Sequence, residues 1–143
     1  MQIITQEYKQ FLFDIKSKTL TKLFDQVQEP TFSPDGTLIA FAKDNNLYDY
    51  NIASKITTQI TVDGKKNEII NGITDWVYEE EFAFVRAFDW SADSKKIGFI
   101  RFDESKVPEF TMSIFEKNLY PTTETFKYPK AGESNASVSL HIY

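Results

Sequence analysis

Residues 32–41 read Phe32-Ser33-Pro34-Asp35-Gly36-Thr37-Leu38-Ile39-Ala40-Phe41, and residues 90–99 repeat this pattern without gaps as Trp90-Ser91-Ala92-Asp93-Ser94-Lys95-Lys96-Ile97-Gly98-Phe99. Each copy begins with an aromatic residue, continues with a Ser-x-Asp turn signal and ends in a short apolar stretch that is typical of a strand. From Phe32 to Trp90 the copies lie 58 residues apart. Internal repetition of this kind indicates a scaffold built from similar units.

A second pair of similar segments gives a different spacing. The segment Phe13-Asp14-Ile15-Lys16-Ser17-Lys18 matches Tyr50-Asn51-Ile52-Ala53-Ser54-Lys55, 37 residues further on. A unit of roughly 40 residues with about four strands is the period of a β-propeller blade. The sequence therefore predicts an all-β fold and a partial β-propeller over residues 1–143, with about two to three four-stranded antiparallel meanders.

The two spacings differ by 21 residues, which predicts an insertion of about that length in the second unit, placed over residues 61–85. An excursion from a repeating scaffold is a favoured place for function. Its second half predicts one short helix near 74–82, with Thr74 or Asp75 as the N-cap. Glu79, Glu80 and Glu81 then fall in the first two turns, where the helix dipole favours carboxylates.

Turn signals recur roughly every eight to twelve residues in the clearer stretches, as in sandwiches, barrels and propellers. The predicted strands cover residues 11–15, 37–42, 47–50, 96–102, 111–115, 123–128 and 137–143. Thirteen Phe, seven Tyr and two Trp favour the half-buried surfaces of a sheet.

Composition narrows the classes of partner. The chain has 143 residues, 41% of them hydrophobic, and a net charge of −5 from 16 basic and 21 acidic residues. This is a globular composition, and its acidity argues against nucleic acid as a partner, since phosphate binding needs a basic surface. There is no cysteine, no signal peptide and no apolar run long enough to span a membrane. Because the chain begins and ends near strand-like segments, we expect a fragment of a larger protein.

Three glutamates in a row have two interpretations. Charge runs are usually solvated, so the first is an exposed acidic face. The second is a cation site, because an ammonium group offers three donors that two carboxylates satisfy by charge-assisted hydrogen bonds. A metal site is less favoured, since no His, Asn or Asp cluster surrounds the run.

Other chemical motifs are missing from the sequence or weak in it. It has no G-x-S-x-G elbow and no Gly-rich phosphate loop, so we expect no catalytic residue, no metal and no cofactor in this chain. The single histidine, His141, lies in a predicted strand and is interpreted as structural. Asp103, Glu104 and Glu109 flank the Val107-Pro108 break and are interpreted as a polar loop.

The segment Asn71-Gly72-Ile73-Thr74-Asp75-Trp76-Val77-Tyr78-Glu79-Glu80-Glu81 resembles the signature of the dipeptidyl peptidase IV family within the prolyl oligopeptidase superfamily. Segments on either side of that signature are also similar to the family: Phe32–Gly36, Val107–Phe110 and Tyr128–Asn135. The resemblance covers almost the whole chain and implies a fragment of the N-terminal eight-bladed propeller, without the C-terminal α/β-hydrolase domain that carries the catalytic Ser, Asp and His.

The resemblance also implies a function. Members of this family are serine exopeptidases that release N-terminal Xaa-Pro and Xaa-Ala dipeptides. By the motif, Glu80 and Glu81 bind the substrate α-ammonium, whereas Glu79 faces elsewhere, and the fragment alone is not catalytic. Peptide N-termini are thus the expected partners of the parent protein. The alternative is a non-enzymatic propeller scaffold whose insertion docks a protein partner.

Residues 103–128 resemble the extended arm used in family dimers, and isolated blades expose strand edges, so we expect self-association or a homodimer. By resemblance the parent is exported to the periplasm or cell surface of a bacterium. Two features depart from the family. No Arg is found around Ile3-Ile4-Thr5, where a carbonyl-binding Arg is expected, and Phe82-Ala83-Phe84 does not assign the aromatic subsite wall.

Overall fold

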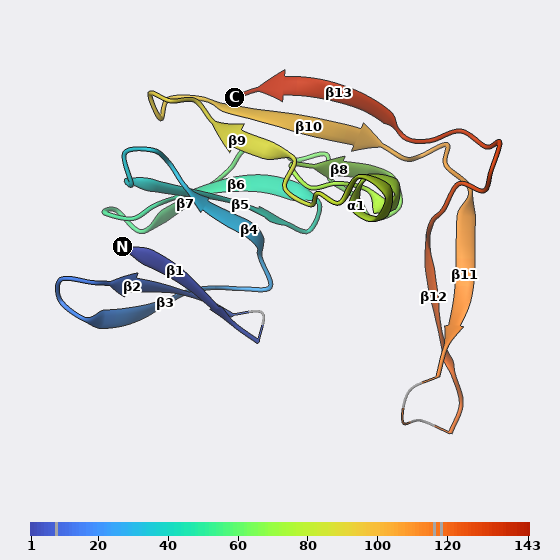
Figure 1. Ribbon diagram of the computed structural model, residues 1–143, viewed down its shortest axis with the longest axis horizontal. Coiled ribbons are helices and arrows are strands. Elements are labelled where there is room, and N and C mark those ends of the chain that lie inside the picture. Colours follow the sequence, from blue (N-terminus) through green and yellow to red (C-terminus); the bar gives the residue numbers. More distant parts are fainter. Residues whose placement is uncertain (8, 116, 118) are drawn as a thin grey trace.

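The computed structural model describes residues 1–7, 9–115, 117 and 119–143 of the chain, and its ribbon is shown in Figure 1. In these residues the chain forms antiparallel strands and one short helix, which confirms the predicted all-β fold class. The elements are β1 (Gln2–Gln6), β2 (Lys9–Asp14), β3 (Thr19–Asp25), β4 (Gln28–Phe32), β5 (Leu38–Lys43), β6 (Asn46–Asn51), β7 (Ile56–Gln59), β8 (Ile69–Asn71), α1 (Trp76–Phe82), β9 (Phe88–Trp90), β10 (Ile97–Asp103), β11 (Glu109–Ile114), β12 (Thr122–Lys127) and β13 (Ser137–Ile142). Within the described residues, no helix is long and apolar enough to cross a membrane.

The first two sheets are consecutive antiparallel meanders, as expected for propeller blades. The first has the order β1-β2-β3 and the second the order β4-β5-β6-β7. They lie one above the other in Figure 1, where they are drawn in dark and light blue to cyan. Only the second has the full four strands predicted for a blade.

The third sheet is built around the long strand β10. Phe99 on the first half of β10 pairs with Phe88 of β9, while Arg101 on the second half pairs with Asn71 of β8. On its other side, β10 pairs with β13. Strands β8 and β9 thus follow each other along one edge of β10, like a single strand that is interrupted between Asn71 and Phe88. The helix α1 emerges from this interruption, within the segment 61–85 predicted as an insertion.

The repeated sequence forms the same turn twice. In the first copy, Ser33 Oγ donates to Asp35 Oδ1 (2.7 Å) and accepts from the Leu38 N–H (3.0 Å). In the second copy, Ser91 Oγ donates to Asp93 Oδ1 (2.6 Å) and accepts from the N–H of Lys96 (3.0 Å). The match between the two sequences is therefore a match between two hydrogen-bonded loops that lead into β5 and β10.

The weaker repeat is also structural. The side chain of Asp14 accepts from the N–H groups of Lys16 and Ser17, and Asn51 Oδ1 accepts from those of Ala53 and Ser54. Both are side-chain-to-backbone turns of the type that Asp and Asn favour. Each lies between the last two strands of its sheet, so the first and second sheets follow the same plan.

The second sheet uses both of its faces. Ala40 and Ala42 on β5 face the third sheet, where they join apolar clusters with Phe88, Phe99 and Phe102. The small alanine side chains let the two sheets approach each other. Phe41 lies between the alanines and therefore faces the opposite way, toward the first sheet, because side chains alternate along a strand.

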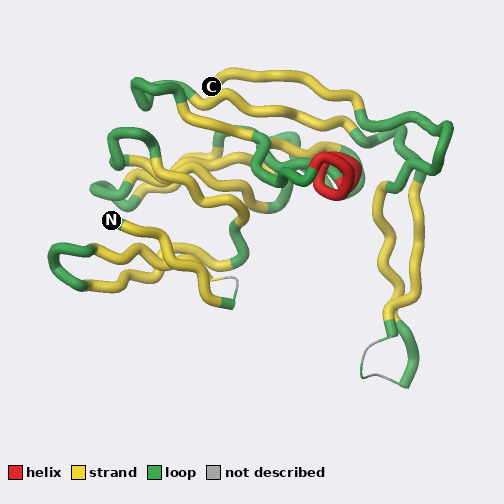
Figure 2. Tube along the Cα trace, in the orientation of Figure 1, coloured by secondary structure: helices red, strands yellow, loops and turns green. Residues whose placement is uncertain are grey.

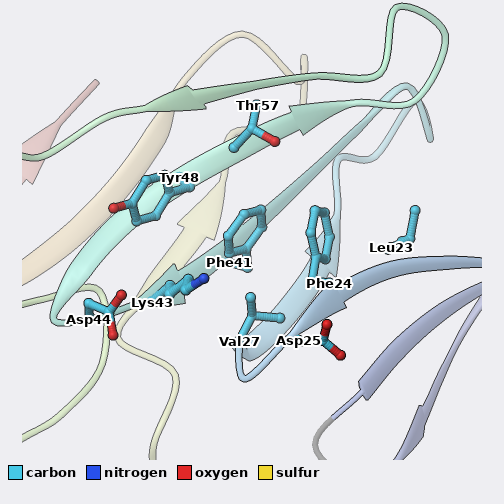
Figure 3. Close-up of a pocket in the computed structure, with 9 residues that line it drawn as sticks. All are labelled: Leu23, Phe24, Asp25, Val27, Phe41, Lys43, Asp44, Tyr48 and Thr57. Carbon is cyan, nitrogen blue, oxygen red and sulfur yellow. The ribbon is translucent and has the colours of Figure 1, made fainter.

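Aromatic rings join the first sheet to the second. The ring of Phe24 on β3 lies 4.4 Å from that of Phe41 and 5.1 Å from that of Tyr50. Figure 3 shows Phe24 and Phe41 side by side at a cavity of about 420 Å³ between the two sheets. Phe41 is buried, and an aromatic pair of this kind adds about 0.5–1.5 kcal/mol beyond the burial of its area.

A hairpin projects away from the sheets. Residues 103–128, predicted as an arm, contain β11 and β12, which pair with each other and form a separate two-stranded sheet. Figure 2 shows this hairpin extending from the body of the molecule at the side that carries the helix. Phe115, Leu119 and Tyr120 near its tip are strongly exposed.

Candidate functional site

The predicted helix is present, and Asp75 caps it. Asp75 Oδ1 accepts a 3.0 Å hydrogen bond from the N–H of Tyr78, as an N-cap side chain does. The helix ends at Ala83, which has a φ of 56° and donates its N–H to the Glu79 carbonyl at 3.1 Å. Seven residues form a marginal helix on their own, so tertiary contacts must hold it in place.

The first of these contacts is a set of hydrogen bonds between residues 72–74 and 84–87, the two chain segments that lead into and out of the helix, here called the neck. The N–H of Thr74 donates to the Val85 carbonyl (3.1 Å), and Thr74 Oγ1 donates to the carbonyl of Phe84 (2.9 Å). Ala87 donates its N–H to the Gly72 carbonyl (3.0 Å). The two chain segments of the loop therefore run antiparallel and fix α1 above the interrupted strand.

The second contact is aromatic packing on the inner side of the helix. The ring of Tyr78 meets Phe102 edge-on at 5.1 Å and Phe84 at 5.8 Å. Phe102 is fully buried in the core cluster that also contains Ile73 and Ala87. Phe82 is largely exposed, so of the three residues left unassigned by the sequence, Phe84 supports the helix and Phe82 faces solvent.

The three glutamates do not share the same surroundings. Glu79 lines a cavity between α1 and the base of the hairpin, whereas Glu80 and Glu81 lie outside that cavity. All three side chains are exposed. Among the residues that the structure describes, none of the three forms an ion pair with a Lys or Arg. Successive helical residues point about 100° apart, so Glu80 and Glu81 project about 100° and about 200° around the helix from Glu79.

A carboxylic acid that the sequence placed in a polar loop is in fact buried. Glu104 lies in the loop between β10 and β11, as predicted, but it is only 6% exposed. Burial, followed by the negative charge of Asp75, raises the pKa of Glu104 to about 7 against the opposing effect of Lys127. Burial also raises the pKa of Asp75. No sequence signal marks Glu104, because the charged residues that share its cavity, such as Asp75 and Lys127, lie more than 20 residues away along the chain.

No arginine lies in strand β1, which covers residues 3–5, and Thr5 Oγ1 there donates to Gln10 Oε1 at 2.7 Å. The arginines of this chain have other partners. Arg86 donates to Thr31 Oγ1 at 3.2 Å, and Arg101 forms a 2.8 Å ion pair with Asp63.

His141 contacts two neighbouring side chains of its sheet. Its ring stacks on Phe99 at 5.4 Å, and its Nε2 lies 2.8 Å from Ser139 Oγ. In the described part of the chain, no group of three or more His, Asp or Glu residues is arranged to hold a metal ion.

Comparison with known proteins identifies the chain's relatives. The family model for the dipeptidyl peptidase IV (DPP IV) N-terminal region matches residues 4–143. The chain is 39% identical over 150 residues to "Probable dipeptidyl-aminopeptidase B" of Talaromyces stipitatus, covering 93% of this chain and 17% of the relative. The protein of the same name from Botryotinia fuckeliana is 39% identical over 153 residues, covering 94% of this chain and 16% of the relative.

A crystal structure has the same fold. Dipeptidyl peptidase 4 of Porphyromonas gingivalis superimposes with a TM-score of 0.87 and 42% sequence identity, covering 99% of this chain and 21% of that one. The chain therefore spans about a sixth to a fifth of the length of these relatives. It belongs to the family of dipeptidyl peptidase IV N-terminal regions.

Proposed function

We propose that this chain is the substrate-recognition part of a dipeptidyl peptidase IV-like serine exopeptidase, in which Glu80 and Glu81 bind the α-ammonium group of a peptide. The parent protein releases N-terminal Xaa-Pro and Xaa-Ala dipeptides. Its nucleophile, base and oxyanion hole lie outside this chain, so the chain alone does not cleave peptides.

The observation that carries the proposal is the separation of Glu79 from the other two glutamates. Glu79 lines the cavity beside the hairpin, whereas Glu80 and Glu81 are exposed and lie outside it. Two adjacent carboxylates without a cationic partner among the described residues fit the three donors of one ammonium group. The capped helix and its neck keep both carboxylates on a fixed support.

Such a site explains how an exopeptidase rejects internal peptide bonds. A substrate without a free N-terminus leaves the two carboxylates unpaired in the closed complex, and an unpaired charge removed from water is costly. The pair thereby holds the peptide's amino end at a fixed distance from the scissile bond.

The experiment substitutes each glutamate in the full-length protein. Glu80→Ala and Glu81→Ala should each lower kcat/KM for dipeptide release about ten- to a hundredfold, because a hydrogen bond to a charged group contributes about 1.5–3 kcal/mol. Glu79→Ala serves as the matched control and should retain most of the activity. Equal kinetics for the three variants would refute the assignment.

The alternative role as an interaction scaffold has its own supporting observation. Leu119 is 90% exposed near the tip of the hairpin, and Phe115 and Tyr120 in the same region are also strongly exposed. Exposed apolar clusters on a projecting element are typical of interaction surfaces. The same exposed residues support self-association of the parent, or a homodimer. Separately, the family resemblance supports the proposal that the parent is exported from a bacterial cell. Fractionation of the source cells tests the latter.

A further inference from the structure

A second cavity separates the helix from the base of the arm hairpin. Its volume is about 390 Å³. Charged groups reach it from four parts of the chain: Asp75 and Glu79 from α1 and its cap, Glu104 after β10, Glu124 and Lys127 from β12, and Lys66 from the loop before β8. The cavity therefore brings four carboxylates and two ammonium groups to the junction of helix and arm.

Glu104 is the most constrained of these groups. Its N–H donates to the Glu68 carbonyl (2.8 Å), and its own carbonyl accepts from the N–H of Val107 (3.0 Å), so the backbone fixes its position. The carboxyl group has no hydrogen-bond partner among the residues that the structure describes. Burial, followed by the charge of Asp75, raises its pKa to about 7, so it changes charge near neutral pH.

Two charged neighbours of Glu104, Asp75 and Lys127, form hydrogen bonds that stabilise other parts of the junction. Asp75 caps α1 through the N–H of Tyr78. Lys127 Nζ donates to the Val107 carbonyl at 2.8 Å and lies 3.6 Å from Glu109 Oε1, so it holds the base of the hairpin. An ionised Glu104 repels Asp75 and attracts Lys127. A movement of Asp75 weakens the cap of α1, and a movement of Lys127 weakens its hydrogen bond at the base of the hairpin.

Direct contacts across the junction connect the arm to the helix and to the loop before β8. The rings of Trp76 on α1 and Tyr128 after β12 lie 4.5 Å apart, edge to face. Asn67 Nδ2 donates to the Thr125 carbonyl at 3.4 Å. A shift of the hairpin base therefore changes the packing of Trp76, the first residue of the helix.

We propose that uptake of a proton by Glu104 locks the arm hairpin against α1, and that Glu104 is in this way a pH-dependent positioning residue for the helix that carries Glu80 and Glu81. The second part rests on the proposed function. When Glu104 loses its proton to solvent, the junction loosens, and the helix is held less firmly by the arm.

Hydrogen exchange of the full-length protein tests the lock without reference to activity. Linkage from an ordinary pKa of 4.5 to about 7 predicts that local opening grows about tenfold between pH 6 and pH 8. Peptides covering residues 74–83 and 109–128 should show this increase after correction for intrinsic exchange. Glu104→Gln should remove it, whereas the matched control Glu124→Gln, an exposed residue on the same cavity, should keep it.

A second variant protects the test against a misfolded Glu104→Gln protein. Asp75→Asn retains an N-cap side chain but removes the neighbouring charge, so the increase in exchange should begin at a lower pH. The proposal is overturned if the wild type shows no pH dependence of opening, or if Glu104→Gln shows the same dependence as the wild type.

Enzyme kinetics then tests the link to the glutamate pair. The KM of the wild type for a dipeptide substrate, divided by that of Glu104→Gln, should rise above pH 7 while the kcat ratio stays constant. Titration of the substrate's own amine affects both proteins equally and cancels in the ratio. If exchange changes but the KM ratio does not, the link to the helix is refuted. If the protein releases no dipeptides, the proposed function fails and exchange still decides the lock.

Discussion

The backbone N–H of Asp35 donates a 3.0 Å hydrogen bond to the Oγ of Ser94, and this bond joins the two copies of the repeated turn. Asp35 belongs to the turn that leads into β5, and Ser94 belongs to the corresponding turn that leads into β10. The repeat thus has two roles. It closes the same loop in neighbouring sheets, and it links those loops to each other.

The serine at the start of each turn should contribute unequally to stability. Ser33 is only 2% exposed, so Ser33→Ala leaves the Leu38 N–H without its side-chain acceptor in a buried place, at a cost of about 1–3 kcal/mol. Ser91 forms the same bonds but is more accessible, so water can replace its hydroxyl and Ser91→Ala should cost less. Urea denaturation of both variants measures the difference, and equal losses would contradict the argument from burial.

Gly72, where the chain leaves the interrupted strand for the neck of the helix, should not tolerate a side chain. Its φ is +77°, and an added Cβ would lie 2.9 Å from Leu47 Cδ1. Gly72→Ala should therefore destabilise the fold by about 2 kcal/mol or more, since a left-handed conformation alone costs a non-glycine residue about 1–2 kcal/mol. Gly98→Ala is the matched control, because nothing lies within 4 Å of its added Cβ. A thermal melt showing similar losses for both variants would refute this role of Gly72.

Stability should fall as the pH rises through the range in which Glu104 ionises. Its folded-state pKa of about 7 exceeds the ordinary 4.5, so the native state binds more protons than the unfolded state between these values. The free energy of unfolding therefore decreases with rising pH there, by about 2.5 kcal/mol between pH 5 and pH 8. Urea titrations at several pH values should show this decrease in the wild type.

Glu104→Gln is the control for that measurement, and its stability should be nearly constant over the same range. The aspartates with lowered pKa values, such as Asp35 and Asp93, act in the opposite direction. They lose their contribution only as the pH falls through their acidic range, so they do not mask the effect. Parallel curves for wild type and Glu104→Gln would assign the decrease to another group.

The parts of the fold that the sequence predicts are those with apolar alternation or strong turn chemistry. Strands β2, β5, β6 and β10 follow from runs such as Ile97–Phe102 and from the Ser-x-Asp turns. Strand β7 was not predicted, because its residues Ile56–Gln59 are all exposed and carry no buried stripe. Strand β8 has three residues, too few to show a period, and only its pairing with β10 makes it a strand.

The candidate site divides in the same way. The cap at Asp75 and the helix after it depend on local chemistry and were predicted correctly. Glu104 is buried beside residues distant in the sequence, such as Asp75 and Lys127, and nothing in the neighbouring sequence indicates this burial. The relation of Glu79 to the arm likewise requires the three-dimensional structure.

The isolated chain should self-associate. Strand β13 lies at the edge of its sheet, and its Leu140 and Ile142 are 74% and 71% exposed. An exposed apolar edge strand invites pairing with another chain, and a lysine on such an edge opposes it. Light scattering should show concentration-dependent association that Leu140→Lys reduces. If Leu119→Lys at the hairpin tip abolishes association and Leu140→Lys does not, the arm is the interface instead.

The glutamate pair should discriminate between free and blocked peptide N-termini. In the full-length protein, acetylation of the substrate's amine removes the charge that Glu80 and Glu81 are proposed to bind, so kcat/KM should fall by about a hundredfold or more, at ~1.4 kcal/mol per tenfold. Glu80→Gln or Glu81→Gln should shrink the ratio between free and acetylated substrate by about ten- to a hundredfold, because the variant gains little from the ammonium group. Glu79→Gln, which changes a side chain of the neighbouring cavity, should leave the ratio as it is. Since the ratio compares two substrates on one enzyme, a general loss of folded protein cancels from it. A ratio that is unchanged in the Glu80 and Glu81 variants would show that the α-ammonium is bound elsewhere.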